Sequence, residues 1–301
     1  MRSHFQMALF CLISFYVNAQ DLEPRFLSSS PTGTNFSGAA YGFSSGNILL
    51  NNLEIENLNA KVNTMVTFYG RSFKLFNKLT KASIAIPYST AKFNALVSDV
   101  DTTAYRNGFN DISFKISMIL IGDEVSTLKE FIKRKQRKFK LGTGFKIKAP
   151  FGRYDETKLL NLGANRWAFQ LKVASSYTVT KRLILELHLD SWFFTENSSY
   201  FNGNSLKQKP ILSTQLHVIY LFGPKLWASA SVGQVAWGET SINGVAKNNN
   251  QKNSKYGASI SYKVRKKSSL KASITNGLYT GRGADFTSAL IGYSFVWFDK
   301  M

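Results

Sequence analysis

Lysine and glycine fill every second position of residues 138–148, within the otherwise apolar stretch KFKLGTGFKIKAPFG at residues 138–152. This phase of residues 138–148 holds two glycines and the lysines Lys138, Lys140, Lys146 and Lys148. An ammonium group is a compact positive charge on a flexible stem, so a row of them is suited to binding anions. The chemistry that this spacing suggests is the recognition of negatively charged solutes.

A period of two is typical of a β-strand, because successive side chains point to opposite faces. Other segments repeat the alternation, with apolar residues in one phase and polar or basic residues in the other. Together with the opening stretch they predict twelve strands, at roughly 35–45, 58–73, 80–88, 111–120, 138–149, 166–178, 182–194, 211–222, 226–238, 255–264, 269–276 and 286–298.

The linkers between these strands alternate in length. Short linkers lie at 75–78, 179–181, 222–225 and 264–267, and the long ones are rich in Asn, Gly, Ser and Asp. The linker 121–137 is longer than its neighbours on that side, and its TLKEFIKRK sequence predicts one or two turns of basic amphipathic helix. This layout predicts a transmembrane antiparallel β-barrel of about 12 strands, with short periplasmic turns and longer extracellular loops.

Aromatic residues near the strand ends fit the same fold. We expect Trp167, Trp192, Trp227, Trp237 and Trp297 to contribute to aromatic girdles at the two membrane interfaces. The aromatic-ended last strand suits recognition by the barrel-assembly machinery, which we expect as a partner beside outer-membrane lipid. The alternative is a soluble, secreted all-β sandwich, whose strands also alternate.

The N-terminus has the layout of a secretory signal peptide. A basic start precedes an apolar stretch at 7–17 and small residues around Ala19. We therefore expect a cleaved signal peptide at 1–19, a periplasmic lead-in at 20–34 and an outer-membrane barrel at 35–301. The one cysteine, Cys11, falls within the signal peptide, so the exported chain would form no disulfides.

The chain is strongly basic, with 38 Lys and Arg against 18 Asp and Glu and a formal net charge of +20. Such an excess suggests nucleic acid, anionic lipid or acidic ligands as partners. Nucleic acid is disfavoured, because the cations are spread through strand-like segments and no zinc-finger spacing or RNA-binding aromatic motif is present. No apolar run after residue 20 is long enough for a membrane-spanning helix.

Several stretches resemble a known family. They include DLEPRFLSSSPTGTNF at 21–36, YGFSSGNILL at 41–50, APFGRYDETKLLNLGANRW at 149–167, WFFTEN at 192–197 and LYTGRGADF at 278–286. Together they resemble the MetA-pathway of phenol degradation family of outer-membrane proteins, over essentially the whole exported chain. The resemblance implies a β-barrel in a Gram-negative outer membrane and a transport role, and it implies no catalytic residue.

If the strands close into a barrel, the apolar phase faces lipid and the basic phase faces the lumen. The predicted lumen-lining set is Lys61, Arg71, Lys81, Lys115, Lys140, Lys146, Lys148, Arg166, Lys172, Arg182, Lys263 and Lys271. Inward acids are fewer, so internal pairing cannot neutralise these cations. A narrow cation-lined passage favours anions. We therefore expect a channel or transporter for small anionic solutes, organic or aromatic acids among them. The alternative is a plugged, structural or adhesive barrel.

The third long loop offers Asn161, Gly163 and Asn165 as solute contacts at the mouth, although Gly and Asn can equally shape a turn. An outer-membrane hydrolase is the rival class. His188 and His217 fall on the inward phase, however, and no G-x-S-x-G motif occurs. We expect both histidines to fill the lumen, no enzymatic activity, and no metal or other cofactor, because no ligand cluster is visible.

Overall fold

The computed structural model describes residues 22–49, 55–123, 125–133 and 137–299. The predicted signal peptide lies outside the described residues. Within them, no helix has the length and apolar character needed to cross a membrane. The architecture is therefore set by the strands.

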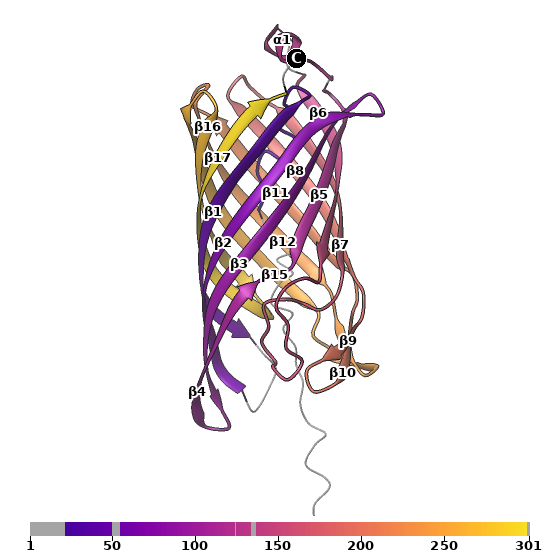
Figure 1. Cartoon of the computed structure of the whole chain (residues 1–301), viewed down its shortest axis with the longest axis vertical. Coiled ribbons are helices and arrows are strands. Elements are labelled where there is room, and N and C mark those ends of the chain that lie inside the picture. The colour runs from indigo at the N-terminus through magenta and orange to yellow at the C-terminus, as the bar shows by residue number, and fades with distance from the viewer. Residues whose placement is uncertain (1–21, 50–54, 124, 134–136, 300–301) are drawn as a thin grey trace, which may run out of the picture.

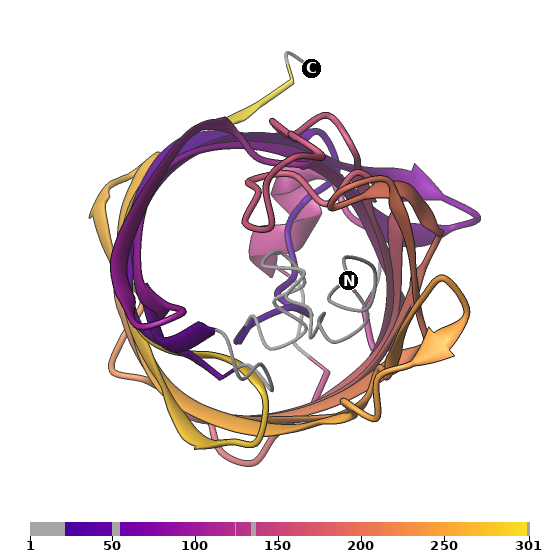
Figure 2. The ribbon, with the colours of Figure 1, turned by 90° about the horizontal axis from the view of Figure 1, so that it is seen from below.

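Twelve strands pair side by side in a closed antiparallel barrel (Figures 1 and 2). In order around the barrel they are β1 (Thr34–Leu49), β2 (Ile55–Leu75), β3 (Lys78–Val97), β5 (Ile112–Ile121), β6 (Phe139–Ala149), β7 (Ala168–Thr178), β8 (Leu183–Phe194), β11 (Ile211–Leu221), β12 (Leu226–Trp237), β15 (Gln251–Arg265), β16 (Ser268–Thr280) and β17 (Gly283–Phe298). Pairing of β17 with β1 closes the barrel, with Thr34 opposite Phe298. Closure pairs the two strand edges that an open sheet would expose to lipid, and the predicted fold class is confirmed.

One strand of the barrel is interrupted. β4 (Val100–Phe109) pairs with the second half of β3, and β5 pairs with its first half. The break at 110–111 lies beside Pro87, whose carbonyl accepts a hydrogen bond from the Asn110 amide at 2.9 Å. The stretch 89–110, predicted as a loop, is therefore largely strand, and β2, β3 and β4 extend beyond the barrel at its loop end (Figure 1).

The long loops carry a second, small sheet. It consists of β9 (Asn197–Tyr200), β10 (Asn204–Gln208), β13 (Thr240–Ile242) and β14 (Val245–Ala246). The short helix α1 (Leu128–Lys133) lies at the opposite end, where sequence predicted helical turns. Figure 1 shows this short-turn end at the top and the loop end at the bottom.

The alternating sequence decides which side chains meet the lumen. In β8, Leu185, Leu187 and Leu189 are exposed on the outer face, whereas Glu186, His188 and Asp190 are buried inside. The same apolar-out, polar-in order holds for β5, β6, β7 and β11. This arrangement suits a barrel surrounded by lipid, because the outer surface is apolar along most of its height.

The inward assignment of Lys61 and Arg71 is wrong, because β2 has the opposite phase. Val62 is buried beside Phe93 in an apolar cluster that loop leucines complete, and Phe68 reaches Gly38 on the inner face of β1. These apolar groups turn inward, so Lys61 and Arg71 turn outward. Each lies near an end of the barrel, where water and headgroups tolerate charge.

Two of the five tryptophans do not belong to the outer girdles. The amines of Lys146 and Lys148 lie 5.9 and 5.4 Å from the ring centre of Trp192, which is only 1 % exposed. Trp227 also faces inward, with the Arg25 guanidinium 5.5 Å from its ring centre. Aromatic rings inside the barrel serve as surfaces for cations, which is a role that strand-end position alone does not reveal.

Candidate solute path

The lumen is partly filled by the chain's own N-terminal segment, residues 22–33, which runs inside the ring of strands (Figure 2). The segment contacts side chains that point into the barrel from the strands around it. This position corrects the predicted periplasmic lead-in. The segment stays inside because the lumen offers charged and polar groups that pair with its own.

Glu23 is the main charged contact of this segment. Its carboxylate lies 3.2 Å from the Lys115 amine and 3.2 Å from the Lys172 amine. Burial alone would raise the pKa of Glu23, but Lys115, Lys172 and Lys146 together hold that pKa well below its usual value. Lys172 also pairs with Asp190 at 3.3 Å, so the carboxylate joins a network across β5, β7 and β8.

Backbone groups of the segment are bonded to the barrel as well. The amides of Arg25 and Phe26 donate to the Glu186 carboxylate at 2.9 and 3.2 Å. Further along, Lys81 donates to the Ser28 carbonyl and Lys140 to the Ser29 hydroxyl. Lys81 and Lys140, which the sequence analysis placed in the solute path, thus also hold the segment in place.

The two glycines between the lysines of β6 make room for the segment. A Cβ at Gly144 would lie 2.8 Å from the ring of Phe26, and one at Gly142 would lie 2.5 Å from a methyl group of Leu27. Both distances are shorter than ordinary van der Waals contact. The alternation of lysine with glycine in this strand therefore combines charge with space for a second chain layer.

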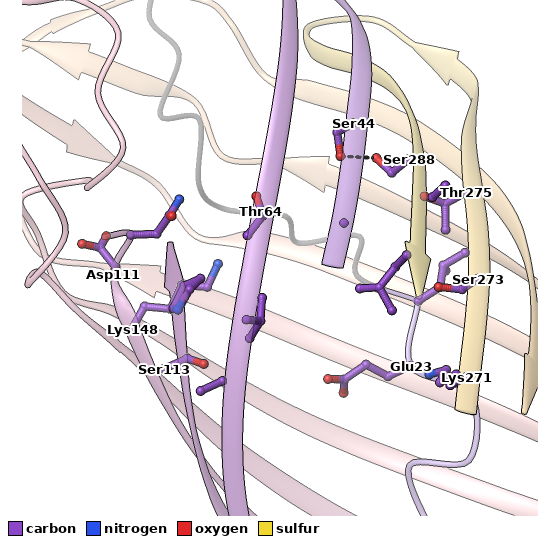
Figure 3. A pocket seen from close by; sticks show the side chains of 18 of the residues that line it. Glu23, Ser44, Thr64, Asp111, Ser113, Lys148, Lys271, Ser273, Thr275 and Ser288 are labelled. Carbon is purple, nitrogen blue, oxygen red and sulfur yellow. Dashed lines mark hydrogen bonds between the residues drawn. The ribbon is translucent and has the colours of Figure 1, made fainter. Parts of the chain in front are cut away.

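A cavity of about 460 Å³ remains in the lumen beside Glu23 (Figure 3). We call it the lumen chamber. Lys146 and Lys148 of β6 line one side, and Lys255 and Lys271 of β15 and β16 line the other. These strands lie on opposite sides of the barrel in strand order. Hydroxyl groups complete the wall, among them those of Ser44, Thr64, Ser113, Ser273, Thr275 and Ser288.

The structure places eleven of the twelve predicted lumen-lining residues in three groups, and Arg166 stands apart from them. Inward side chains are those of Lys81, Lys115, Lys140, Lys146, Lys148, Lys172 and Lys271. Arg182 and Lys263 are exposed beside short turns, outside the chamber. Lys61 and Arg71 lie on the outer face, where Arg71 pairs with Asp299 at 2.5 Å.

Arg166 lies at the loop end of the lumen and is 2 % exposed. Its guanidinium donates to the Gln208 side chain at 2.5 Å and lies over the Phe194 ring, 4.6 Å from the ring centre. Burial lowers the pKa of Arg166 to about 10. This position fits a residue that fixes the loops against the barrel.

The proposed mouth residues have contacts within their own loop. The Asn161 side chain accepts from the Asp155 amide and donates to the Lys158 carbonyl, at 2.9 and 2.7 Å. Gly163 packs so closely against Gly152 that a Cβ added at Gly163 would lie 2.7 Å from the Gly152 backbone. Asn165 adopts φ +50° and donates to Asn197 at 2.9 Å. These contacts fit the turn-shaping alternative.

Lys255 and Glu23 line the chamber but are absent from the predicted set. Lys255 lies on the polar phase of its strand, so alternation gave a signal for it. Glu23 had no such signal, because it precedes the first strand and no period connects it to the lumen. Its importance follows only from the path of the N-terminal segment.

The histidines lie in the lumen wall, as their phase predicts. Nδ1 of His217 is 2.7 Å from the Ser231 hydroxyl, and Nε2 of His217 is 3.3 Å from Nδ1 of His188. Both rings are fully buried, and Phe26 covers His188 with ring centres 5.5 Å apart. The Ser–His contact has the donor and acceptor types of a catalytic pair, but it lies beneath the N-terminal segment. Its surroundings are those of an interior hydrogen-bond chain.

Comparison with known proteins agrees with this geometry. The family described as "Putative MetA-pathway of phenol degradation" matches residues 57–284. The crystal structure of the COG4313 outer membrane channel from Pseudomonas putida F1 has 16 % identity and a TM-score of 0.78, covering 92 % of this chain and all of that one. The β domain of the Bordetella autotransporter BrkA has 11 % identity and a TM-score of 0.53, over 88 % of this chain and 100 % of that one.

No curated protein matches the chain at a significant level. At these low identities the solved structures establish the fold alone, and that fold is an outer-membrane β-barrel. With the family match, this places the chain in the cell outer membrane, surrounded by lipid.

Proposed function

We propose that this chain, which belongs to the MetA-pathway of phenol degradation family, is an outer-membrane channel that prefers small anionic solutes. The observation that carries the proposal is the lumen chamber, which has lysines on two opposite walls. Among the described residues, inward lysines outnumber inward carboxylates, so the lumen keeps a positive potential. Rings of basic side chains select for anions in pores.

The chain itself provides an example of the ligand chemistry. Glu23 is a carboxylate held by two lumen lysines, Lys115 and Lys172, within 3.2 Å of each. A solute carboxylate of similar size would meet the same kind of partners in the adjoining chamber. The similar structure from Pseudomonas putida is that of an outer membrane channel, which supports transport through this fold.

The size and lining of the chamber limit the solute. A volume of about 460 Å³ suits a molecule of the size of an aromatic or other small organic acid. Hydroxyl groups of the wall would bind polar substituents, and Val66, Pro87 and Leu290 offer an apolar patch to a ring. Organic acids, aromatic carboxylates included, are the solute class that we propose.

The decisive test is the reversal potential of the refolded protein in a planar bilayer under a potassium chloride gradient. We expect a shift toward the chloride equilibrium value, which the double variant Lys148→Gln, Lys271→Gln should reduce. The double variant Lys61→Gln, Arg71→Gln is the matched control, because it also removes two cations and both residues lie on the outer face. Cation preference, or an equal effect of the control, would contradict the proposal.

The same recording tests the competing function. Protein shown to be folded that conducts nothing under any solute would favour a structural or adhesive barrel, which the occupied lumen also permits. Delivery by the barrel-assembly machinery is expected for either function, since both require insertion of a closed barrel in the outer membrane.

A further inference from the structure

A second collection of cations lies outside the lumen, at the short-turn end of the barrel. It comprises the lysines and arginines within 74–78, 129–133, 137–138, 181–182, 225 and 263–267, and we call it the basic rim. Apart from Lys78, which is half-buried, these side chains are exposed. Each connection between neighbouring barrel strands at this end contributes at least one cation, so the charge encircles the barrel rather than marking one side.

The loop end shows a different balance. Ion pairs join three of its lysines to acids: Lys158 to Asp155 at 2.6 Å, Lys207 to Glu196 at 3.3 Å, and Lys209 to Glu239 at 2.6 Å. Carboxylates and cations are interspersed through the loops. The strong positive charge of the chain is therefore concentrated in the lumen and on the basic rim.

Among the described residues, the acids at the short-turn end contact groups other than the cations at 263–267. Asp299 pairs with Arg71, and Asp123 lies 3.9 Å from the amine of Lys140. Glu130 accepts from the Thr127 amide at the start of α1, at 2.7 Å. None of these carboxylates neutralises the cluster of four cations at 263–267.

Apolar groups stand among the cations of the basic rim. Phe76 lies between Lys74 and Lys78 and is 83 % exposed, and Phe222 is 55 % exposed three residues before Lys225. A turn that presents both a ring and an ammonium group suits the boundary between headgroups and acyl chains, where amphipathic residues concentrate. A purely aqueous partner would not favour these exposed rings.

We propose that the basic rim binds the phosphate groups of anionic phospholipids in the periplasmic leaflet of the outer membrane. Short turns mark the periplasmic end of such barrels. A leaflet surrounds the whole barrel, as the cations do, whereas a globular partner would contact one side. Clustered lysines and arginines beside a membrane-spanning element attract anionic headgroups. This inference is independent of the solute that the lumen passes.

The test measures which lipids gather around the protein. The exported chain is reconstituted in phosphatidylcholine bilayers, and its association with spin-labelled phosphatidylglycerol is compared with that of spin-labelled phosphatidylcholine. We expect a preference for phosphatidylglycerol on the order of twofold or more, falling with added salt. Replacement of Lys263, Arg265, Lys266 and Lys267 by glutamine should reduce that preference.

The matched control removes four cations from the loop end, by replacing Lys158, Lys207, Lys209 and Lys252 with glutamine. It should leave the preference at the wild-type level. Equal association of the two lipids with the wild type, or an equal loss in both variants, would overturn the proposal. So would a rim variant that keeps its lipid preference but loses binding to isolated cell-wall sacculi. If the rim variant does not fold, a wild-type preference that is insensitive to salt overturns the proposal.

Discussion

At the scale of single residues, Glu23 joins the N-terminal segment to lysines of two strands. We predict that Glu23→Gln releases the segment more often, because a neutral amide loses two charge-assisted contacts. One hydrogen bond to a charged group contributes about 1.5–3 kcal/mol, and because the glutamine amide oxygen still accepts from a lysine, we expect a net loss of about that size. The released population should rise about tenfold to a hundredfold. Protease cleavage of the segment and single-channel conductance would both report this change.

Glu56→Gln is a suitable control for that experiment, since Glu56 is exposed at the loop end of β2. It changes the net charge equally and touches no residue of the segment. Unchanged cleavage in Glu23→Gln would mean that the other contacts of the segment, with Glu186, Lys81 and Lys140, hold it without the Glu23 carboxylate.

The pH response of the segment follows from the same carboxylate. The pKa of Glu23 is lowered in the folded state. The Glu23 carboxylate therefore stabilises the docked segment fully at pH values above the ordinary glutamate pKa, and this stabilisation is lost as the pH falls through the lowered pKa. We predict constant segment protection from pH 7 to about 5, and release only in stronger acid. Proteolysis with an acid-stable protease would measure it. Glu23→Gln should lose this step, and a step that persists in that variant would assign it to another group.

At the scale of elements, β6 is shaped to accept a second layer. We predict that Gly144→Val displaces the segment, because the added carbon atoms would overlap the Phe26 ring. We expect faster proteolysis of the segment. The variant should keep the electrophoretic mobility of the folded barrel on unheated gels. Gly42→Val is the control, since a Cβ at that inward glycine meets nothing closer than 3.8 Å. Equal proteolysis of the two variants would contradict the packing role of Gly144.

The sequence predicted most barrel strands because their period-two pattern is strong. In β8, leucines alternate with Glu186, His188 and Asp190, and only one phase can face lipid. β2 offered no such contrast: Val62 and Phe68 share one phase, and Met65 and Tyr69 share the other. Val62 and Phe68 turn inward because loop leucines and a glycine of β1 contact them, and no local pattern encodes those distant partners.

The candidate site was predictable only in part for the same reason. Alternation identified the inward lysines of β6, which are held by the register of the sheet. The sequence of residues 22–33 has no hydrophobic period, since the segment is irregular. Its position is set mainly by contacts with lumen side chains of several strands. Contacts between distant parts of the chain are thus what the sequence left undetermined.

At the scale of the whole molecule, the barrel's outer surface should report membrane depth. Leu187 lies in the middle of β8 and Leu270 near the short-turn end of β16, and both face outward with 44 % and 40 % exposure. We predict that Leu187→Arg lowers the free energy of unfolding from lipid vesicles by about 2–4 kcal/mol, and Leu270→Arg by about 0–1 kcal/mol.

The difference arises because an arginine at mid-height must be buried in hydrocarbon, whereas one near the rim reaches headgroup phosphates. Denaturant titration of both variants in the same vesicles would measure it. The basic rim lies at the same end as Leu270, so an arginine at that position would join cations already at the interface. Equal losses at the two positions would mean that the barrel does not sit in the bilayer with its short turns at one surface. A larger loss at Leu270 would contradict the assignment of that end to the interface.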